Sequence, residues 1–320
     1  MTLPGSDADT EFPAPAEPKE DPYFASAAKH DPYAALRIAD YRRLMLACGA
    51  SSVGGEVQAV AIGWELYERT RSATVLGLIG LVQLLPVYLL ALPSGHAADL
   101  YSRTRLFVIS EALLALAAVG LAALSFGGGP VWASYLCLAL TGTGQALLRP
   151  ARWALMPQVV PREALQNAVT WNSTSWQVAT IAGPAIGGVI IARAGGAGWA
   201  YVLTAALSAL AIAQIGAIRT RPAPNPIEPT TLKTFLAGFK FIGANDLILA
   251  TITLDLFAVL LGGAQALLPM FASDILHVGP EGLGWLRSAE SIGAVMMALV
   301  IAHLRPFQKA GPTLIAAVSA

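Results

Sequence analysis

The feature that most constrains this chain is a series of apolar runs about twenty residues long, and a run of that length spans the hydrocarbon core of a bilayer as a helix. Hydrophobic residues make up 55% of the 320 residues. Charged residues make up only 12%, about half the fraction typical of soluble domains. The formal net charge is zero, which gives no reason to expect nucleic acid as a partner. The sequence therefore predicts an all-α membrane protein whose main surroundings are the lipid bilayer.

Eight complete membrane-spanning helices are expected. They are predicted at Leu44–Tyr67, Val75–Ala98, Leu106–Phe126, Val131–Leu148, Ala168–Ala192, Trp199–Ile218, Leu247–Ala272 and Leu283–His303. A final apolar run of about ten residues is too short to cross the bilayer. We interpret it as the start of a ninth helix.

Two segments differ in composition from the apolar runs. Residues 1–36 are rich in proline and acidic residues and cannot bury enough apolar surface to fold, so a disordered cytosolic tail is predicted there. Residues 219–245 begin with four prolines and continue into an amphipathic stretch, which predicts a cytosolic linker and a helix lying at the membrane interface. These segments divide the membrane region into a six-helix half, 37–218, and an incomplete second half, 246–320.

The distribution of basic residues predicts the orientation. With the N-terminus in the cytosol, sixteen of the 20 Lys and Arg residues lie on the cytosolic side. The four assigned to the outer side are Arg69, Arg71, Arg193 and Arg287. This bias follows the positive-inside rule. A multi-pass protein of the cell membrane with a cytosolic N-terminus is therefore predicted.

The segment Gly95–Arg105, between the second and third predicted helices, combines a glycine, an acid and two arginines. It resembles motif A of the major facilitator superfamily, although it departs from the usual residues at Leu100, Ser102 and Thr104. An ordinary positive-inside loop is the alternative. The resemblance implies a cytosolic latch between two halves of a transporter, formed by Gly95, Asp99, Arg103 and Arg105.

Two further segments resemble the same superfamily. The fifth predicted helix contains a sequence similar to the antiporter motif of its exporters, in Gly183, Pro184, Gly187 and Gly188. Proline bends a helix and glycines permit close helix contact, so a generic packing face is the alternative. The stretch from Leu148 to Ala168 resembles the loop between helices 4 and 5 in the branch that includes the enterobactin exporter and macrolide efflux proteins.

Short internal matches suggest that the chain contains two related halves. Asp40, Gly54, Gln58 and Leu76 recur at a nearly constant offset as Asp246, Gly262, Gln265 and Leu283. The superfamily resemblance implies a helical bundle of two six-helix halves. On that plan four helices are missing, and a truncated product or fragment is expected.

Polar side chains inside the apolar helices are the candidate functional residues, because a charge at bilayer depth is costly unless it faces a cavity or a partner. Glu56 and Asp255, at similar depth in the first and seventh helices, are the candidates for proton coupling. A structural hydrogen bond or ion pair is the alternative for both. The candidates for lining a substrate cavity are Gln58, Gln145, Asn172, Trp176, Gln177 and Gln265.

These observations predict a secondary active transporter that is not an enzyme. We expect proton-coupled efflux of a small amphipathic drug, siderophore or secondary metabolite by alternating access. The sequence shows no metal-ligand spacing and no nucleotide-binding loop, so no cofactor and no metal are expected. A non-transporting membrane remnant or scaffold is the alternative, and an in-frame continuation of the coding DNA would argue against it.

Overall fold

The computed structural model describes residues 31–91, 93–95, 101–218, 243, 246–261 and 263–303. Every regular element in these ranges is a helix. The six longer helices of the first part are α2 (Ala39–Thr70), α3 (Ala73–Leu89), α5 (Arg103–Phe126), α6 (Val131–Val159), α7 (Leu165–Ala194) and α8 (Gly198–Gly216). The later helices are α10 (Asp246–Leu261), α11 (Leu268–Met270) and α12 (Gly279–His303). The short turns of helix are η1 (Ala35–Arg37), η2 (Arg162–Ala164), η3 (Gly263–Leu267) and η4 (Phe271–Ile275).

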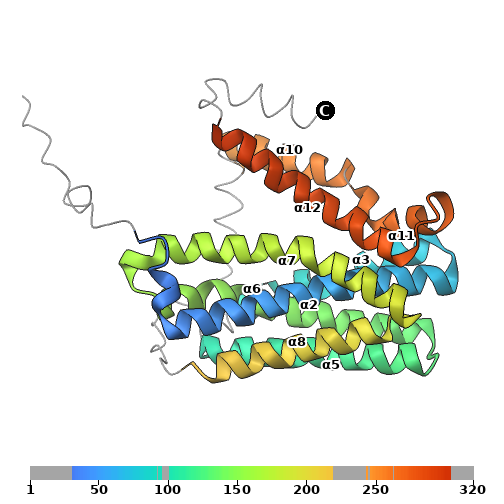
Figure 1. The fold of residues 1–320 in the computed structure, drawn as a ribbon, viewed down its shortest axis with the longest axis horizontal. Helices are drawn as coiled ribbons and strands as arrows, with labels where there is room; N and C mark the ends of the chain where they lie inside the picture. Colours follow the sequence, from blue (N-terminus) through green and yellow to red (C-terminus); the bar gives the residue numbers. More distant parts are fainter. Residues whose placement is uncertain are drawn as a thin grey trace, which may run out of the picture.

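The six helices from α2 to α8 form one bundle with their axes along a common direction (Figure 1). The most extensive contacts join α5 to α6 and α8, α2 to α7 and α8, and α3 to α6. Helix α12 crosses the bundle obliquely and packs on α7. The first part of the chain is therefore one packed unit, and α7 is the helix that joins it to α12.

The bundle has two polar ends. We call the end at which α2 begins the basic end, because Arg42, Arg43, Arg103, Arg105 and Arg162 lie on the segments that meet there. At the opposite end, α2 stops where Arg71 adopts a left-handed conformation with φ 50° and its N–H bonds to Tyr67 O at 2.7 Å. Helix α7 stops there in the same way at Gly195, with φ 69°. Such residues end helices because their conformation turns the chain away from the helix axis.

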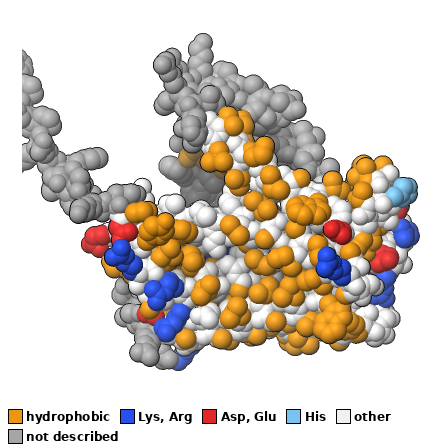
Figure 2. All heavy atoms as spheres, viewed as in Figure 1, with side chains coloured by type: hydrophobic (Ala, Val, Ile, Leu, Met, Phe, Trp, Pro, Cys, Tyr) orange, Lys and Arg blue, Asp and Glu red, His pale blue; other side chains and the backbone are white. Residues whose placement is uncertain are grey.

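The middle of the bundle has the surface of a membrane protein. Figure 2 shows hydrophobic side chains over most of the visible face, with charged side chains mainly toward the two ends. Leu85, Leu116, Trp132 and Leu136 are each more than half exposed. Six described helices are long and apolar enough to cross a membrane: α2, α5, α6, the run Arg162–Ala194, α8 and α12. This confirms a helical protein with multiple candidate spans.

The other two predicted spans have shorter described helices. Helix α3 has 17 residues against the predicted Val75–Ala98, and α10 has 16 residues against the predicted Leu247–Ala272. Part of each predicted span, and the predicted linker apart from Gly243, lies outside the described residues.

One predicted boundary is wrong at the end of the fourth span. We expected the helix to stop at Leu148 and a loop to follow, whereas α6 continues to Val159. The helix continues because Ala151, Leu155 and Val159 recur every four residues and are buried in one apolar cluster. Prolines at positions 150 and 157 lie within it. Burial of the apolar face stabilises the helix more than the loss of two backbone N–H donors destabilises it.

The chain is already held against the bundle before the predicted start of the membrane region at residue 37. Pro32 O accepts hydrogen bonds from Asn167 Nδ2 at 2.7 Å and Trp171 Nε1 at 2.9 Å. The Asn167 side chain in turn accepts from the Ala35 N–H at 3.0 Å. Tyr33 stacks against Trp171 with ring centroids 5.9 Å apart. The last residues assigned to the tail therefore dock on α7, and residues 1–30 lie outside the described structure.

Candidate functional site

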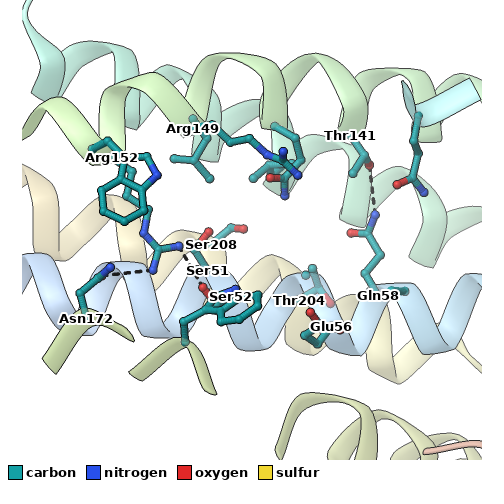
Figure 3. A pocket seen from close by; sticks show the side chains of 18 of the residues that line it. Ser51, Ser52, Glu56, Gln58, Thr141, Arg149, Arg152, Asn172, Thr204 and Ser208 are labelled. Carbon is teal, nitrogen blue, oxygen red and sulfur yellow. Dashed lines mark hydrogen bonds between the residues drawn. The ribbon is translucent and has the colours of Figure 1, made fainter. Parts of the chain in front are cut away.

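A cavity of about 830 Å³ lies inside the six-helix bundle (Figure 3). Most of its lining comes from α2, α6 and α7, with Gln83 from α3, Leu114 from α5 and two residues from α8. The lining is rich in hydroxyl and amide groups, which include Ser51, Ser52, Gln58, Gln83, Thr141, Gln145, Asn172, Ser173, Gln177, Thr204 and Ser208. Such a mixture of polar groups on an apolar scaffold is typical of a small-molecule site.

The structure brings most of the sequence candidates together at this cavity. Glu56 lines it, together with five of the six cavity candidates: Gln58, Gln145, Asn172, Trp176 and Gln177. Gln265 does not line it, because it lies in η3 and its side chain donates to Glu290. Asp255 is on α10, and its side chain lies outside the described part of the structure. The roles assigned to these residues in binding and coupling remain predictions.

Gln58 has a structural partner as well as a place at the cavity. Its Nε2 donates to Thr141 Oγ1 at 3.0 Å, which joins α2 to α6. The side chain is almost completely buried. A buried amide without a partner is costly, so this bond stabilises the crossing of the two helices.

Two arginines of the cavity, Arg149 and Arg152, were not among the sequence candidates. Both were predicted in a loop, whereas α6 carries them along the cavity wall. Arg152 is held by two neutral acceptors, Ser52 Oγ at 3.1 Å and Asn172 Oδ1 at 3.3 Å (Figure 3). A signal for their position was present, because Arg149 and Arg152 follow Gln145 at spacings of four and seven residues, which places all three on one face of a helix.

Behind the cavity wall lies a buried acid, Glu111 of α5. Its side chain has no solvent exposure, and neither carboxylate oxygen accepts a well-formed hydrogen bond from the residues that the structure describes. The polar groups around it are Ser51, Ser208 and Arg152. Glu111 is not part of the cavity lining.

Glu56 lies where α2, α7 and α12 come together. A Cβ atom on Gly183 would fall 2.5 Å from Glu56 Cβ, so only a glycine permits this approach of α7. The charges that act on Glu56 come from Arg287 and Glu290, both on α12. Arg287, which was counted with the outer side, lies two turns inside α12, within a stretch apolar enough to cross the membrane. Glu56 offers it an opposite charge there.

The antiporter-like motif forms the contact surface between the bundle and α12. A Cβ atom on Gly187 would meet the Val57 backbone at 3.3 Å, and one on Gly188 would meet Pro280 O at 2.5 Å. Nearby, Ser288 Oγ of α12 donates to Ile181 O of α7 at 2.7 Å. The motif thus touches α2 on one side and α12 on the other, with Pro184 inside the helix between these contacts.

The two arginines of motif A lie at the basic end of the bundle. Arg103 and Arg105 occupy the first turn of α5, where Ser102 Oγ accepts from the Arg105 N–H at 3.3 Å. Ser102 is thus an N-cap at a position where the superfamily often has glycine. Gly95 is described, whereas Asp99 lies outside the described residues. The latch remains a prediction.

Comparison with known proteins agrees with this architecture. Residues 30–320 match the major facilitator family described as transmembrane secretion effector. The multidrug efflux pump Tap of Mycolicibacterium fortuitum is 28% identical over 289 residues, which cover 86% of this chain and 69% of Tap. The enterobactin exporter EntS of Shigella boydii serotype 4 is 26% identical over 265 residues, which cover 82% of this chain and 63% of EntS. The chain thus spans about two thirds of the length of these relatives.

Solved structures show the same fold at low sequence identity. A crystal structure of the peptide transporter POT aligns with a TM-score of 0.62 and 15% identity, over 82% of this chain and 67% of POT. POT in complex with sulfate aligns with a TM-score of 0.56 and 14% identity, over 84% of this chain and 71% of POT. The sequence relatives are transport proteins, which confirms the expectation that the chain is not an enzyme. The chain belongs to the transmembrane secretion effector family of the major facilitator superfamily.

Proposed function

We propose that this chain forms the substrate-binding half, and part of the second half, of a proton-coupled exporter of small amphipathic molecules. The observation that carries the proposal is the cavity of about 830 Å³ with an ionisable side chain, Glu56, in its wall. A transporter of this fold works by rocking its halves around a central binding site. The exporters Tap and EntS, which are similar over most of the chain, support the direction of transport.

In this proposal eight helices cross the cell membrane and the basic end faces the cytosol. The bias of Lys and Arg toward this end supports the orientation. The N-terminus then lies in the cytosol. The cavity residues Arg149 and Arg152 near the end of α6, and Asn172 near the start of α7, lie toward the same end, so in this proposal a substrate enters from the cytosol.

Glu56 is the proposed coupling residue because its charge state determines its attraction to α12. The ionised carboxylate is attracted by Arg287 and repelled by Glu290, both on α12, and a low dielectric constant strengthens such interactions. Protonation removes both interactions. Gly183 keeps α7 in contact with Glu56, so a change in the interaction at Glu56 is transmitted to the surface on which α12 packs. Asp255, predicted at a similar depth in the second half, is the second candidate.

The test measures transport by the chain reconstituted in vesicles, with and without an imposed pH gradient. Three fluorescent probes cover the charge classes: ethidium, N-phenyl-1-naphthylamine and 8-anilinonaphthalene-1-sulfonate. We expect at least one probe to move in response to the gradient, and Glu56→Gln, the neutral mimic, to abolish that response. Glu68→Gln is the matched control, because Glu68 is an exposed acid of the same helix. A gradient response that survives Glu56→Gln would remove Glu56 as the coupling residue, and Asp255→Asn would be tested next.

The same measurement addresses the second function left open by the sequence, a membrane protein that does not transport. If no probe moves under any gradient, although the chain is inserted and binds a probe, the non-transporting function is favoured. The family relationship and the cavity weigh against that outcome.

A further inference from the structure

The charges of the cavity wall are unevenly distributed. Two of the ionisable residues that line it are cations, Arg149 and Arg152, and the third is the acid Glu56. The arginines are three residues apart on α6, so they share one face of that helix. Glu56 belongs to a different part of the wall, where the charge of Arg287 already acts on it. The part of the cavity nearest the arginines is therefore positive.

Neither arginine is neutralised by a close carboxylate in the described structure. The ion pairs within 4.0 Å among the described residues involve other side chains. Arg152 donates to the hydroxyl of Ser52 and the amide of Asn172, which fix its guanidinium without cancelling its charge. The charges of buried Glu111 and Arg152 also act on each other, but Glu111 does not line the cavity. Arg149 is exposed.

Two indole rings line the same cavity as these cations. Trp153 follows Arg152 on α6, and Trp176 comes from α7, four residues after Asn172. Their side chains are 60% and 50% exposed, so their faces are available to a ligand. Tryptophan supplies a large apolar contact area, and arginine binds carboxylate, sulfonate or phosphate oxygens through paired N–H groups.

We propose that Arg149 and Arg152 bind the anionic group of the transported molecule, and that Trp153 and Trp176 contact its apolar or aromatic part. The substrate class is then an amphipathic organic anion that carries a carboxylate, sulfonate or phosphate. That the bound anion is the transported molecule rests on the proposed function. The binding site itself is independent of transport and is tested by binding alone.

The test uses two dyes that share a skeleton and differ in one charged group. 8-Anilinonaphthalene-1-sulfonate is the anion, and N-phenyl-1-naphthylamine is the same ring system without the sulfonate. Each is titrated by fluorescence into the purified chain in nanodiscs of neutral lipid, and the signal of empty discs is subtracted. We expect Arg149→Gln and Arg152→Gln each to weaken binding of the anion about tenfold, the usual effect of losing a charge-assisted hydrogen bond. Binding of the neutral dye is expected to stay unchanged.

Two further variants separate recognition from folding. Arg162→Gln removes a cation from the same end of the bundle but outside the cavity, so it leaves the affinity for both dyes unchanged. Arg152→Lys keeps the charge but loses the paired donors, and it recovers part of the affinity for the anion. Because no hydrogen bond within the described structure involves the Arg149 side chain, Arg149→Gln tests the proposal even if Arg152→Gln disturbs the fold.

Three results would overturn the proposal. One is equal loss of affinity for both dyes in the arginine variants, because the arginines would then be structural. Another is unchanged affinity for the anionic dye. The third concerns the source of the anion. Binding of the anionic dye is compared in nanodiscs with phosphatidylglycerol and in neutral ones. We expect the difference in affinity between the parent and the arginine variants to persist in both. If the anionic lipid abolishes that difference, a lipid headgroup occupies the site. Failure of transport with intact anion binding would count against the proposed function and not against this site.

Discussion

The contact between α7 and α12 allows a sharp prediction, because two glycines there face each other across backbone atoms. A Cβ atom on Gly188 would lie 2.5 Å from Pro280 O and 3.0 Å from Gly284 Cα. A Cβ atom on Gly284 would lie 2.5 Å from Pro184 O. Cβ atoms essentially never come closer than 3.0 Å to such neighbours. In Gly188→Ala the two helices must therefore separate by several tenths of an ångström.

The cost follows from what the methyl group meets. Backbone atoms cannot rotate away as a side chain can, so the strain spreads over the whole crossing. Overpacking of this kind destabilises proteins by about 1–3 kcal/mol. The separation also weakens the hydrogen bond from Ser288 Oγ to Ile181 O, which is 2.7 Å long in the structure. Because Gly188 and Gly284 share one contact, the double alanine variant should cost less than the sum of the two single variants.

The assay is thermal unfolding of the purified chain in detergent, followed by helical circular dichroism. The matched control is Gly80→Ala, because Gly80 lies inside α3 and a Cβ atom there meets no atom within 4 Å. Alanine in open space is expected to be neutral or stabilising, since it favours the helix by up to about 1 kcal/mol. We expect Gly188→Ala to lower the midpoint by a few degrees relative to Gly80→Ala. Equal midpoints, or strictly additive alanine effects at Gly188 and Gly284, would refute the tight crossing.

Two other predictions concern the ends of the bundle. In a background without the native cysteines, Gly196→Cys should react with an impermeant thiol reagent added outside intact cells and Glu163→Cys should not; the reverse pattern would overturn the proposed orientation. At the end where α2 stops, the pKa of the exposed Asp274 is lowered by hydrogen bonds from Tyr67 and Ser273 and by the charge of Arg71. Because this pKa is lowered, the contact between α2 and η4 stabilises the fold fully above the ordinary aspartate pKa of about 4. Its contribution is lost as the pH falls through the lower pKa that Asp274 has in the folded protein. Spin labels on the ends of α2 and η4 should therefore keep a narrow distance distribution at neutral pH and a broad one in strong acid, whereas in Asp274→Asn the distribution should be broad at both.

The fold class could be predicted because it depends on properties that are local in the sequence. Apolar run length alone indicates a membrane helix, and the predicted cores of α2, α5, α7 and α8 agree with the observed helices. The polar residues of the cavity could be proposed for a related reason. An amide such as Gln145 or Asn172 inside an apolar helix needs a partner or water, and both residues line the cavity.

The errors have a common cause in contacts between distant segments. Prolines and arginines after Leu148 are typical of a loop, and this composition led to the misplacement of Arg149 and Arg152. The helix persists because its apolar face packs against α2 and α5 residues such as Leu44 and Phe107, and no single segment contains that information.

The position of Arg287 shows how one such contact changes the functional argument. From the sequence, Glu56 has no basic partner inside the first six helices, so protonation is the natural way to lower its desolvation cost. The structure supplies a cation from α12 across the crossing that Gly183 and Gly188 permit. In the proposed exporter, a nearby Arg287 favours the ionised form of Glu56, and withdrawal of α12 would favour the protonated form. Proton binding at Glu56 and the position of α12 are then linked by one interaction, so coupling in the proposed exporter requires no relay of residues between separate sites.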